Sequence, residues 1–359
     1  MEQVAVTGLG ALITNATGIV GGWNSTSTHE AVFNYIPPQK QALPALLALE
    51  SQGLFDVPHI SPAQSERRSV VWGVSKNNYT SFENWKSGLP SDEFFSDSYA
   101  RFLAQTYQCA GQVLCPIAAC ASGSHALILG ARLIEQGDAD VVLCGATEPP
   151  QHPMVLAAYR NMGALSASGI MRPFDKRRDG FVPASGSGFL ILESLSYAQS
   201  RGAQIHVLLS GYSMCADATH MTSMCPSGDS VVRAIEEALD RANHPNIGYV
   251  NAHGTATKQN DAIEAVALNR TLGTQVAVSS TKPLTGHLLG ASGAVEAVLS
   301  ILALKNGQLP PTLGLEEPEY ELNFVQVGEK KQQLEAVLSL NYGFGGHIGA
   351  IIFSRQEQF

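Results

Sequence analysis

Short apolar runs recur through the first half of the chain, and each is long enough for one buried strand. They lie at residues 4–7, 70–74, 114–119 and 141–144. Gly8-Leu9-Gly10 follows the first run and is expected to end that strand. Residues 121–136 carry apolar side chains on nearly every face of a helix, so we expect a helix buried on all sides, with Gly137 just beyond its end.

Three other stretches of the first half are predicted to form a hairpin or irregular structure and no long helix. Gly186-Ser187-Gly188 separates the apolar residues 181–182 and 189–193, a pattern typical of a hairpin. Residues 24–66 contain five prolines, and residues 75–98 are polar and aromatic without periodicity.

The second half repeats this order of elements. Strand-like runs lie at residues 207–210, 249–252, 276–279, 337–341 and 348–353, and helical patterns lie at 231–242 and 292–305. The glycine-rich residues 343–346 separate the last two runs and predict a second hairpin. Alternation of strands and helices indicates an α/β protein, and the echo between the halves indicates a duplicated unit.

Composition and charge exclude several classes of protein. The 359 residues are 45% hydrophobic and 15% charged, which is typical of a globular chain with a sizeable core. The net charge of −9 argues against a general nucleic-acid binder. An acidic partner would need only a local basic patch.

Cysteine usage and the N-terminus indicate the cellular setting. The six cysteines form no C-x-x-C pair and are too sparse for a disulfide scaffold, so no metal site is predicted. The first residues do not resemble a signal peptide, and no apolar run approaches the roughly 20 residues of a membrane span. We therefore expect a cytoplasmic protein.

Cys120 lies where a strand is expected to give way to a helix. The free N–H groups and the dipole of a helix start favour a thiolate, so we expect the pKa of Cys120 to fall. Its small neighbours in ACASG (119–123) leave room for a substrate. An isolated cysteine is more often a buried structural residue, and the other five cysteines keep that interpretation.

Two histidines occupy similar positions. His253 lies in NAHGTAT after one predicted strand, and His287 ends STKPLTGH after another. Lys282 lies in an apolar region and needs a partner, for which Glu296 is the natural candidate. Together with a cysteine, two such histidines suggest a nucleophile with separate proton or electrostatic helpers, although a histidine at a strand end is equally often structural.

These motifs together resemble the β-ketoacyl-acyl carrier protein synthases of the elongating type, the ketosynthases of the thiolase superfamily. The resemblance runs almost end to end, and several long motifs in one order make a chance match negligible. The motifs are VAVTGLG (4–10), ACASG (119–123), RPFDKRRDGFV (172–182), DATHMTS (217–223), NAHGTAT (251–257), TKPLTGHLLGASG (281–293) and GFGG (343–346).

The resemblance implies a fold and a reaction. The thiolase fold has two duplicated α/β halves in a five-layered α-β-α-β-α core, here residues 1–203 with the nucleophile and 204–359 with both histidines. Cys120 would accept an acyl chain from the phosphopantetheine of an acyl carrier protein. Malonyl-carrier protein would lose carbon dioxide and attack that thioester, in fatty-acid or type II polyketide or polyene synthesis. The enzyme itself would bind no cofactor, and it would form a homodimer or a heterodimer with a chain-length-factor-like homologue.

The resemblance also implies roles for single residues. The backbone N–H groups of Cys120 and Phe344 match an oxyanion hole, and Phe344 matches a gate residue. Thr255 and Thr257 match positions that bind the pantetheine arm. The remaining matches form one group, in which the histidines would stabilise the malonyl-derived enolate with support from the ion pair: His253, His287, Lys282 and Glu296.

Docking of an acidic carrier protein would require exposed basic residues. The candidates form two clusters, Arg67 with Arg68, and Lys176 with Arg177 and Arg178. Either cluster is equally well explained as solvated surface charge.

Three departures from the family pattern leave chain length, gating and partner geometry open. Residues 30–100 lack part of the usual N-terminal half, ASGS (184–187) replaces a usual Gly-acid-Gly-small run, and His347-Ile348 stand where Thr-Asn is usual.

Other functions fit the motifs less well. A chain-initiating synthase would pair its cysteine with His and Asn, and a thiolase would carry a second late cysteine, whereas none follows Cys225. A cysteine hydrolase would have no use for Lys282 beside two histidines. The main alternative is a non-catalytic chain-length factor, although such proteins usually lack the nucleophile that Cys120 supplies.

Overall fold

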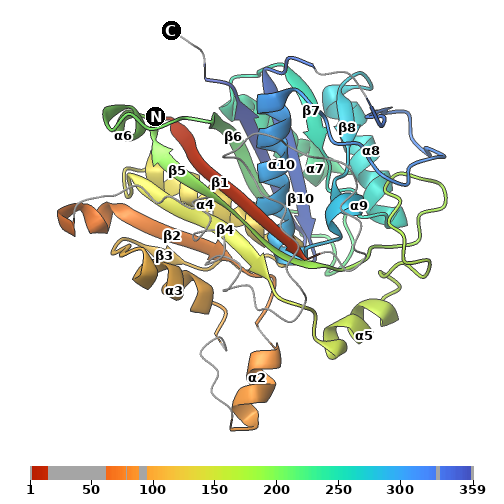
Figure 1. Ribbon diagram of the computed structural model, residues 1–359. Helices are drawn as coiled ribbons and strands as arrows, with labels where there is room; N and C mark the ends of the chain where they lie inside the picture. The colour runs from red at the N-terminus through yellow and green to blue at the C-terminus, as the bar shows by residue number, and fades with distance from the viewer. Residues whose placement is uncertain (1, 15–61, 78, 89–94, 329–331, 357–359) are drawn as a thin grey trace.

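The computed structural model describes residues 2–14, 62–77, 79–88, 95–328 and 332–356, and their strands form one sheet (Figure 1). The strands are β1 Val4–Thr14, β2 Arg68–Gly73, β3 Val113–Leu114, β4 Val141–Glu148, β5 Ser185–Ser194, β6 Val207–Ala216, β7 Ile247–Asn251, β8 Ala277–Ser279, β9 Asn323–Phe324, β10 Ala336–Gly343 and β11 His347–Ser354. The helices are α2 Tyr79–Lys86, α3 Ser98–Thr106, α4 Ser122–Glu135, α5 Pro153–Asn161, α6 Leu195–Ser200, α7 Asp229–Arg241, α8 Lys258–Leu272, α9 Lys282–Thr285 and α10 Ser292–Asn306. Three short 3₁₀ turns are η1 Pro62–Arg67, η2 Ala119–Ala121 and η3 Leu289–Ala291.

The sheet consists of two halves with the same topology. Outward from the antiparallel β1–β6 junction, one half runs β1-β5-β4-β2-β3 and the other runs β6-β11-β10-β7-β8, with β9 as an extra edge strand. In each half the first three strands are antiparallel and the last three are parallel. The predicted duplication of an α/β unit is therefore confirmed, and the boundary expected at 203/204 falls between α6 and β6.

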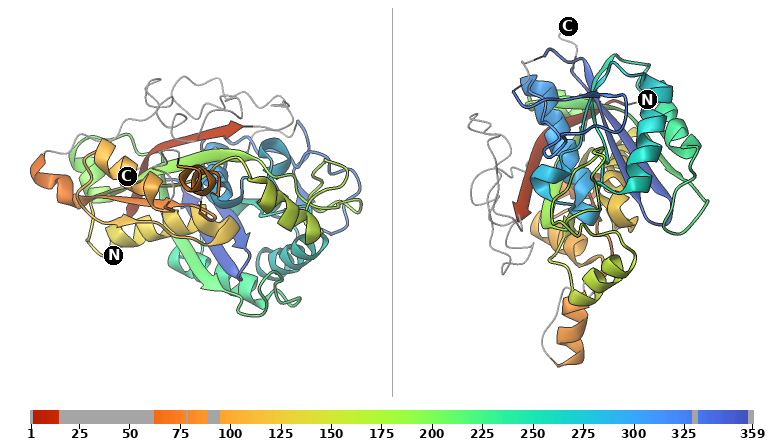
Figure 2. Two further views of the ribbon diagram at one scale, coloured as in Figure 1. Left: turned by 90° about the horizontal axis from the view of Figure 1, so that it is seen from below. Right: turned by 90° about the vertical axis from the view of Figure 1, so that its right-hand side faces the viewer.

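Helices α4 and α10 lie at the centre of the molecule. Both helices touch each other and strands of both halves, so the sheet folds around them. Helix α3 packs on the outer side of β2, and α7 packs on β6 and β11 with α8 beside it, which gives five layers of alternating helix and sheet (Figure 2). The described stretch Leu289–Asn306 is apolar and long enough to cross a membrane, but 89% of it is buried as a core helix.

Glycines within strands explain two errors of the sequence prediction. Strand β1 continues through Gly8 and Gly10 instead of ending there, because these glycines leave room for side chains of β5. A Cβ atom at Gly10 would lie 2.4 Å from Phe189 Cε1. Similarly, 186–188 form no hairpin but lie inside β5, where a Cβ atom at Gly188 would lie 2.7 Å from the backbone nitrogen of Val295 in α10. The predicted hairpin at 343–346, in contrast, is confirmed by the pairing of β10 with β11.

Other differences concern the segments before Cys120. The expected strand at 114–119 is only the two-residue β3, and Ile117 is half exposed. Residues 75–98 contain α2, which stands away from the body of the molecule, and the start of α3 (Figure 1). Most of 24–66, predicted to be irregular, lies outside the described residues.

The two central helices approach each other most closely at paired glycines. A Cβ atom at Gly123 of α4 would lie 2.7 Å from the backbone nitrogen of Ala294 in α10, and one at Gly293 of α10 would lie 2.5 Å from the backbone nitrogen of Ser124. Backbone atoms cannot move aside as a flexible side chain can, so these glycines bring the first turns of both helices into direct contact.

We predict that Gly123→Ala lowers the free energy of unfolding by about 1–3 kcal/mol, the usual cost of overpacking, despite the better helix propensity of alanine. Gly130→Ala on the same helix is the matched control, because its new methyl group would meet mainly side-chain atoms of Cys144 and Val142 at 3.1–3.3 Å. Urea denaturation of both variants measures the difference. Equal stability of the two variants would contradict the close approach of α4 and α10.

Candidate active site

The predicted nucleophile lies at a turn that the fold builds twice. Cys120 is in η2, between β3 and α4, and the duplicated half places η3 in the same way before α10. The residue that opens each turn, Ala119 or Leu289, has the unusual positive φ of 48° or 44°. Cys120 of the first half therefore corresponds to Gly290 of the second.

One cavity of about 530 Å³ brings most of the predicted site residues together. Both histidines, both threonines, Phe344 and the cysteine line it: Cys120, His253, Thr255, Thr257, His287 and Phe344. Thr255 and Thr257 share a hydrogen bond of 2.8 Å between their hydroxyl groups, and Phe344 lies near Tyr159 with 6.5 Å between ring centroids. Met162, Lys258 and Gln259 form part of the same wall.

Cys120 is buried, with 8% of its surface exposed. The pKa of its thiol is raised to about 12, mainly by burial and in addition by the nearby Glu148 carboxylate, whereas Lys76 and Lys282 act in the opposite direction. The expectation of a lowered pKa is therefore wrong, because loss of solvation outweighs the helix start. The cysteine is a neutral thiol until a reaction removes its proton.

Two backbone N–H groups beside Cys120 are available to a ligand. Among the residues that the structure describes, neither Cys120 nor Phe344 donates its N–H to a protein acceptor. Gly343 lies against the turn of Cys120, where a Cβ atom would be 2.4 Å from the carbonyl oxygen of Ala118 and 3.1 Å from the nitrogen of Cys120. Only glycine at 343 keeps this N–H accessible.

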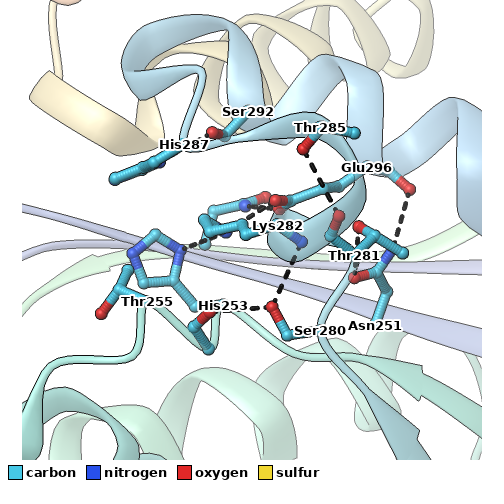
Figure 3. Close-up of polar contacts among 12 residues, drawn as sticks. Asn251, His253, Thr255, Ser280, Thr281, Lys282, Thr285, His287, Ser292 and Glu296 are labelled. Atoms are coloured by element: carbon cyan, nitrogen blue, oxygen red, sulfur yellow. Dashed lines mark hydrogen bonds and ion pairs between the residues drawn. The ribbon is translucent and has the colours of Figure 1, made fainter. Parts of the chain in front are cut away.

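Lys282 determines which nitrogen of His253 carries the proton. The Lys282 ammonium lies 3.3 Å from Nδ1 of His253, and an ammonium can only donate (Figure 3). Nδ1 therefore accepts, and Nε2 bears the hydrogen of the neutral ring. Burial, with Lys282 and His287 adding to its effect, keeps the pKa of His253 well below its usual value.

A buried ion pair holds Lys282 in place. Its Nζ lies 2.6 Å from Oε1 of Glu296, and the other carboxylate oxygen accepts a hydrogen bond of 2.6 Å from Asn341. Both charged side chains are essentially inaccessible to solvent. The partner expected for Lys282 is thus present, and Glu296 supports the site by fixing the ammonium.

The backbone of the 172–182 motif holds His287. The N–H of His287 donates to the carbonyl of Val182 at 2.8 Å, and its carbonyl accepts from Ala184 at 2.9 Å. Nδ1 of His287 lies 3.0 Å from the Ser292 hydroxyl, which can donate to it and leave the hydrogen on Nε2. Burial and the charge of Lys282 keep the pKa of His287 well below its usual value.

Two buried acids that the sequence analysis did not identify shape the turn of His253. On α8, Glu264 accepts the N–H groups of His253 and Gly254 at 2.7 and 2.8 Å, and Asp261 accepts that of Thr255 at 3.1 Å. Burial raises the pKa of Glu264 to about 7 and that of Asp261 to about 6. Their spacing of three on the helix after HGTAT is a signal that could have identified them.

Four of the five predicted docking residues are unsuited to a docking surface at the cavity. Arg67 and Arg68 lie at the start of β2, at the opposite end of this strand from the site, and Arg67 pairs with Asp140 at 2.7 Å. Arg68 and Arg178 are only 7% and 4% exposed, which excludes both from a docking surface. The other two candidates are exposed, but Arg177 pairs with Asp175 and Glu316, which leaves Lys176.

Among the described residues, no group of three or more His, Cys, Asp or Glu side chains could hold a metal ion.

Comparisons with known proteins agree on one family. The description "Beta-ketoacyl synthase, N-terminal domain" matches residues 45–198, and "Beta-ketoacyl synthase, C-terminal domain" matches residues 206–316. The chain is 42% identical over 255 residues to the 3-oxoacyl-[acyl-carrier-protein] synthase 2 of Synechocystis sp., covering 68% of this chain and 61% of that protein. It is 39% identical over 279 residues to the tetracenomycin polyketide synthase ketoacyl synthase alpha subunit of Streptomyces glaucescens, covering 74% and 66%. The matches thus span just under two thirds of these relatives.

Solved structures extend the similarity to almost the whole chain. A chain from the solved complex of a type II polyketide synthase acyl-carrier protein with its ketosynthase superposes with a TM-score of 0.83 at 27% identity, and the match covers 99% of this chain and 100% of that one. A β-ketoacyl synthase from Burkholderia phymatum gives the same TM-score and coverage at 28% identity. The expected thiolase fold is thereby confirmed.

We predict that both imidazoles of the site stay neutral from pH 8 down to pH 6, with the hydrogen of His253 on Nε2. The reason is that their pKa values lie well below the ordinary value of about 6.5, so protonation begins only in more acidic solution. Long-range ¹H–¹⁵N NMR of ¹⁵N-histidine-labelled protein distinguishes the tautomers, and the exposed His244 provides an internal reference. An imidazolium signal from either residue at pH 6.5 would contradict this electrostatic picture.

Proposed function

The chain belongs to the β-ketoacyl synthase family, and from this premise we propose that it is a β-ketoacyl-acyl carrier protein synthase. The reaction is the decarboxylative condensation of an acyl chain on Cys120 with malonyl-acyl carrier protein. The observation that carries the proposal is the meeting of Cys120, His253 and His287 around one cavity. Two neutral imidazoles beside a thiol are better suited to stabilising an enolate than to catalysing the hydrolysis of a thioester.

In the first half-reaction the sulfur of Cys120 attacks the thioester carbonyl of the acyl carrier. The N–H groups of Cys120 and Phe344 stabilise the oxyanion that forms. The C–S bond to pantetheine then breaks, and the proton of Cys120 leaves with the pantetheine sulfur. Because the thiol of Cys120 has a pKa of about 12, its proton transfer must accompany the attack.

In the second half-reaction malonyl-pantetheine occupies the same cavity. Its carboxylate leaves as carbon dioxide, and the electron pair of the broken C–C bond becomes an enolate. The Nε2–H groups of His253 and His287 donate to the enolate oxygen, a stabilisation that grows as charge develops. The enolate carbon attacks the Cys120 thioester, and the C–S bond breaks to give the β-ketoacyl product and the Cys120 thiolate, which takes up a proton from solvent to restore the thiol.

Other residues of the cavity suit the substrate carrier. Thr255 and Thr257 present adjacent hydroxyl groups to a pantetheine arm, and Phe344 lies in a loop whose Gly345 and Gly346 have positive φ angles and allow it to move. The substrates arrive on phosphopantetheine, so the enzyme needs no cofactor of its own. We propose fatty-acid or type II polyketide or polyene synthesis as the pathway, with a homodimer or a chain-length-factor-like homologue as the assembly.

Cys120→Ala should abolish acyl-enzyme formation while the fold persists, because alanine leaves only a small cavity. Intact mass spectrometry after incubation with acyl-carrier proteins measures the added acyl mass. Cys225→Ala is the matched control and should be acylated like the native chain. His253→Ala should still accept the acyl group but release carbon dioxide roughly 10²–10³-fold more slowly.

Acyl mass on another residue of the Cys120→Ala variant would contradict the assignment of the nucleophile. Absence of acylation in the native chain, with every acyl carrier tested, would favour a chain-length-factor-like partner instead.

A carrier protein should dock through the basic residues beside the cavity. Lys258 is exposed on the wall of the cavity, and its carbonyl accepts a hydrogen bond from Arg178, so the exposed Lys176 lies in the same region. We predict that Lys176→Glu with Lys258→Glu raises the KM for carrier-bound substrate about tenfold and weakens its dependence on salt.

The control variant for docking is Arg67→Glu, at the distant end of β2, which should change KM little. A small pantetheine thioester lacks the carrier surface, so its acylation of Cys120 should be unaffected at either ionic strength. An equal loss with the small thioester would mean that the lysine variants damage the cavity and that docking lies elsewhere.

A further inference from the structure

A second, partly buried ion pair lies beside Cys120, outside the motifs that indicate the family. Lys76 follows the carboxyl end of β2, and Glu148 is the last residue of the adjacent parallel strand β4; Nζ of Lys76 lies 2.6 Å from Oε1 of Glu148. The carboxylate of Glu148 is 1% exposed, whereas the side chain of Lys76 is 23% exposed. Gln151 donates a further hydrogen bond of 2.7 Å to the same oxygen.

The other oxygen of Glu148 holds the turn between His287 and α10. The backbone N–H of Gly290 donates to Oε2 of Glu148 at 3.0 Å. The segment that carries Lys76 closes this turn from the other side, because a Cβ atom at Gly290 would lie 2.5 Å from the nitrogen of Ser75. The negative carboxylate also interacts favourably with the positive, N-terminal end of the α10 helix dipole. Glu148 therefore fixes the backbone only three residues after His287.

The charges of the pair act on the nucleophile in opposite directions. After burial itself, Glu148 raises the pKa of the Cys120 thiol, and Lys76 lowers it. The other titratable groups that face Cys120 are Tyr159 on α5, His253, Lys282 and His287 from the second half, and Glu296 on α10. Lys282 already has Glu296 as its partner, so Lys76 is the cation that balances Glu148.

We propose that Lys76 and Glu148 are a positioning pair for the condensation site. Glu148 anchors the turn after His287, and Lys76 cancels the negative charge that this anchor would otherwise place beside the thiol of Cys120. The inference rests on Cys120 as the reacting residue, but it can be tested without any acyl substrate.

The test is alkylation of Cys120 by iodoacetamide in the full-length protein, followed by peptide mass spectrometry at fixed pH below the pKa of the thiol. Only the thiolate reacts, so the rate reports the pKa. Lys76→Met removes the positive charge and should slow alkylation about three- to tenfold, whereas Glu148→Gln removes the negative charge and should accelerate it by a similar factor. The double variant should return to within about twofold of the native rate.

Two controls separate charge from loss of structure. Lys76→Arg keeps the charge and should react like the native chain. Cys144 is fully buried, so its alkylation in any variant reports unfolding. If Glu148→Gln unfolds, the partly exposed Lys76 still tests the proposal through Lys76→Met against Lys76→Arg.

Rates that are unchanged, or that fall in both single variants, would overturn the proposal, because a purely structural pair gives no opposite signs. The assignment of synthase activity would survive that result, since it depends on acylation of Cys120 and not on Lys76. Conversely, the alkylation rates of the two single variants could shift in opposite directions while the chain accepts no acyl group. That result would support the electrostatic role of the pair and contradict the proposed synthase function.

Discussion

The contact between the first turns of α4 and α10 is the constraint on which the rest of the site depends. Gly123 and Gly293 let each helix start touch the backbone of the other. Cys120 precedes one of these turns and His287 precedes the other, so residues from two halves of the chain meet although 167 positions separate them. A side chain at either glycine would push Cys120, the proposed nucleophile, away from His287.

This contact also creates an electrostatic problem. Two helices meet with the positive ends of their dipoles, and the site adds the buried ammonium of Lys282. Glu296 compensates Lys282, and Glu148 compensates the start of α10 through the N–H of Gly290. Burial, with the positive charge of Lys282 adding to its effect, lowers the pKa of both imidazoles and keeps them neutral, so that they can donate hydrogen bonds to negative charge on a substrate oxygen.

Sequence patterns predicted the parts of this arrangement that depend on local spacing. The central helices, the hairpin before β11 and the partnership of Lys282 with Glu296 follow from apolar periodicity, from a glycine run and from the cost of an unpaired buried charge. Gly10 and Gly188 misled the prediction because their role is to admit Phe189 and the backbone of α10, which are contacts across the fold. The raised pKa of Cys120 was missed for the same reason, since its burial depends on elements distant in sequence.

The duplicated halves show why only one of two equivalent turns can react. Glu148 and Gly343 are the last residues of the equivalent strands β4 and β10. Glu148 of the first half accepts a hydrogen bond from the N–H of Gly290 in the second half. Gly343 of the second half has no side chain and leaves the N–H of Cys120 in the first half open. The same backbone N–H thus serves as an anchor where a carboxylate accepts its hydrogen bond, and as the proposed oxyanion site where glycine leaves it open. A thiol at position 290 would face a carboxylate and a closed turn, so a reactive residue fits the turn that faces Gly343 of the other half and not the turn that faces Glu148.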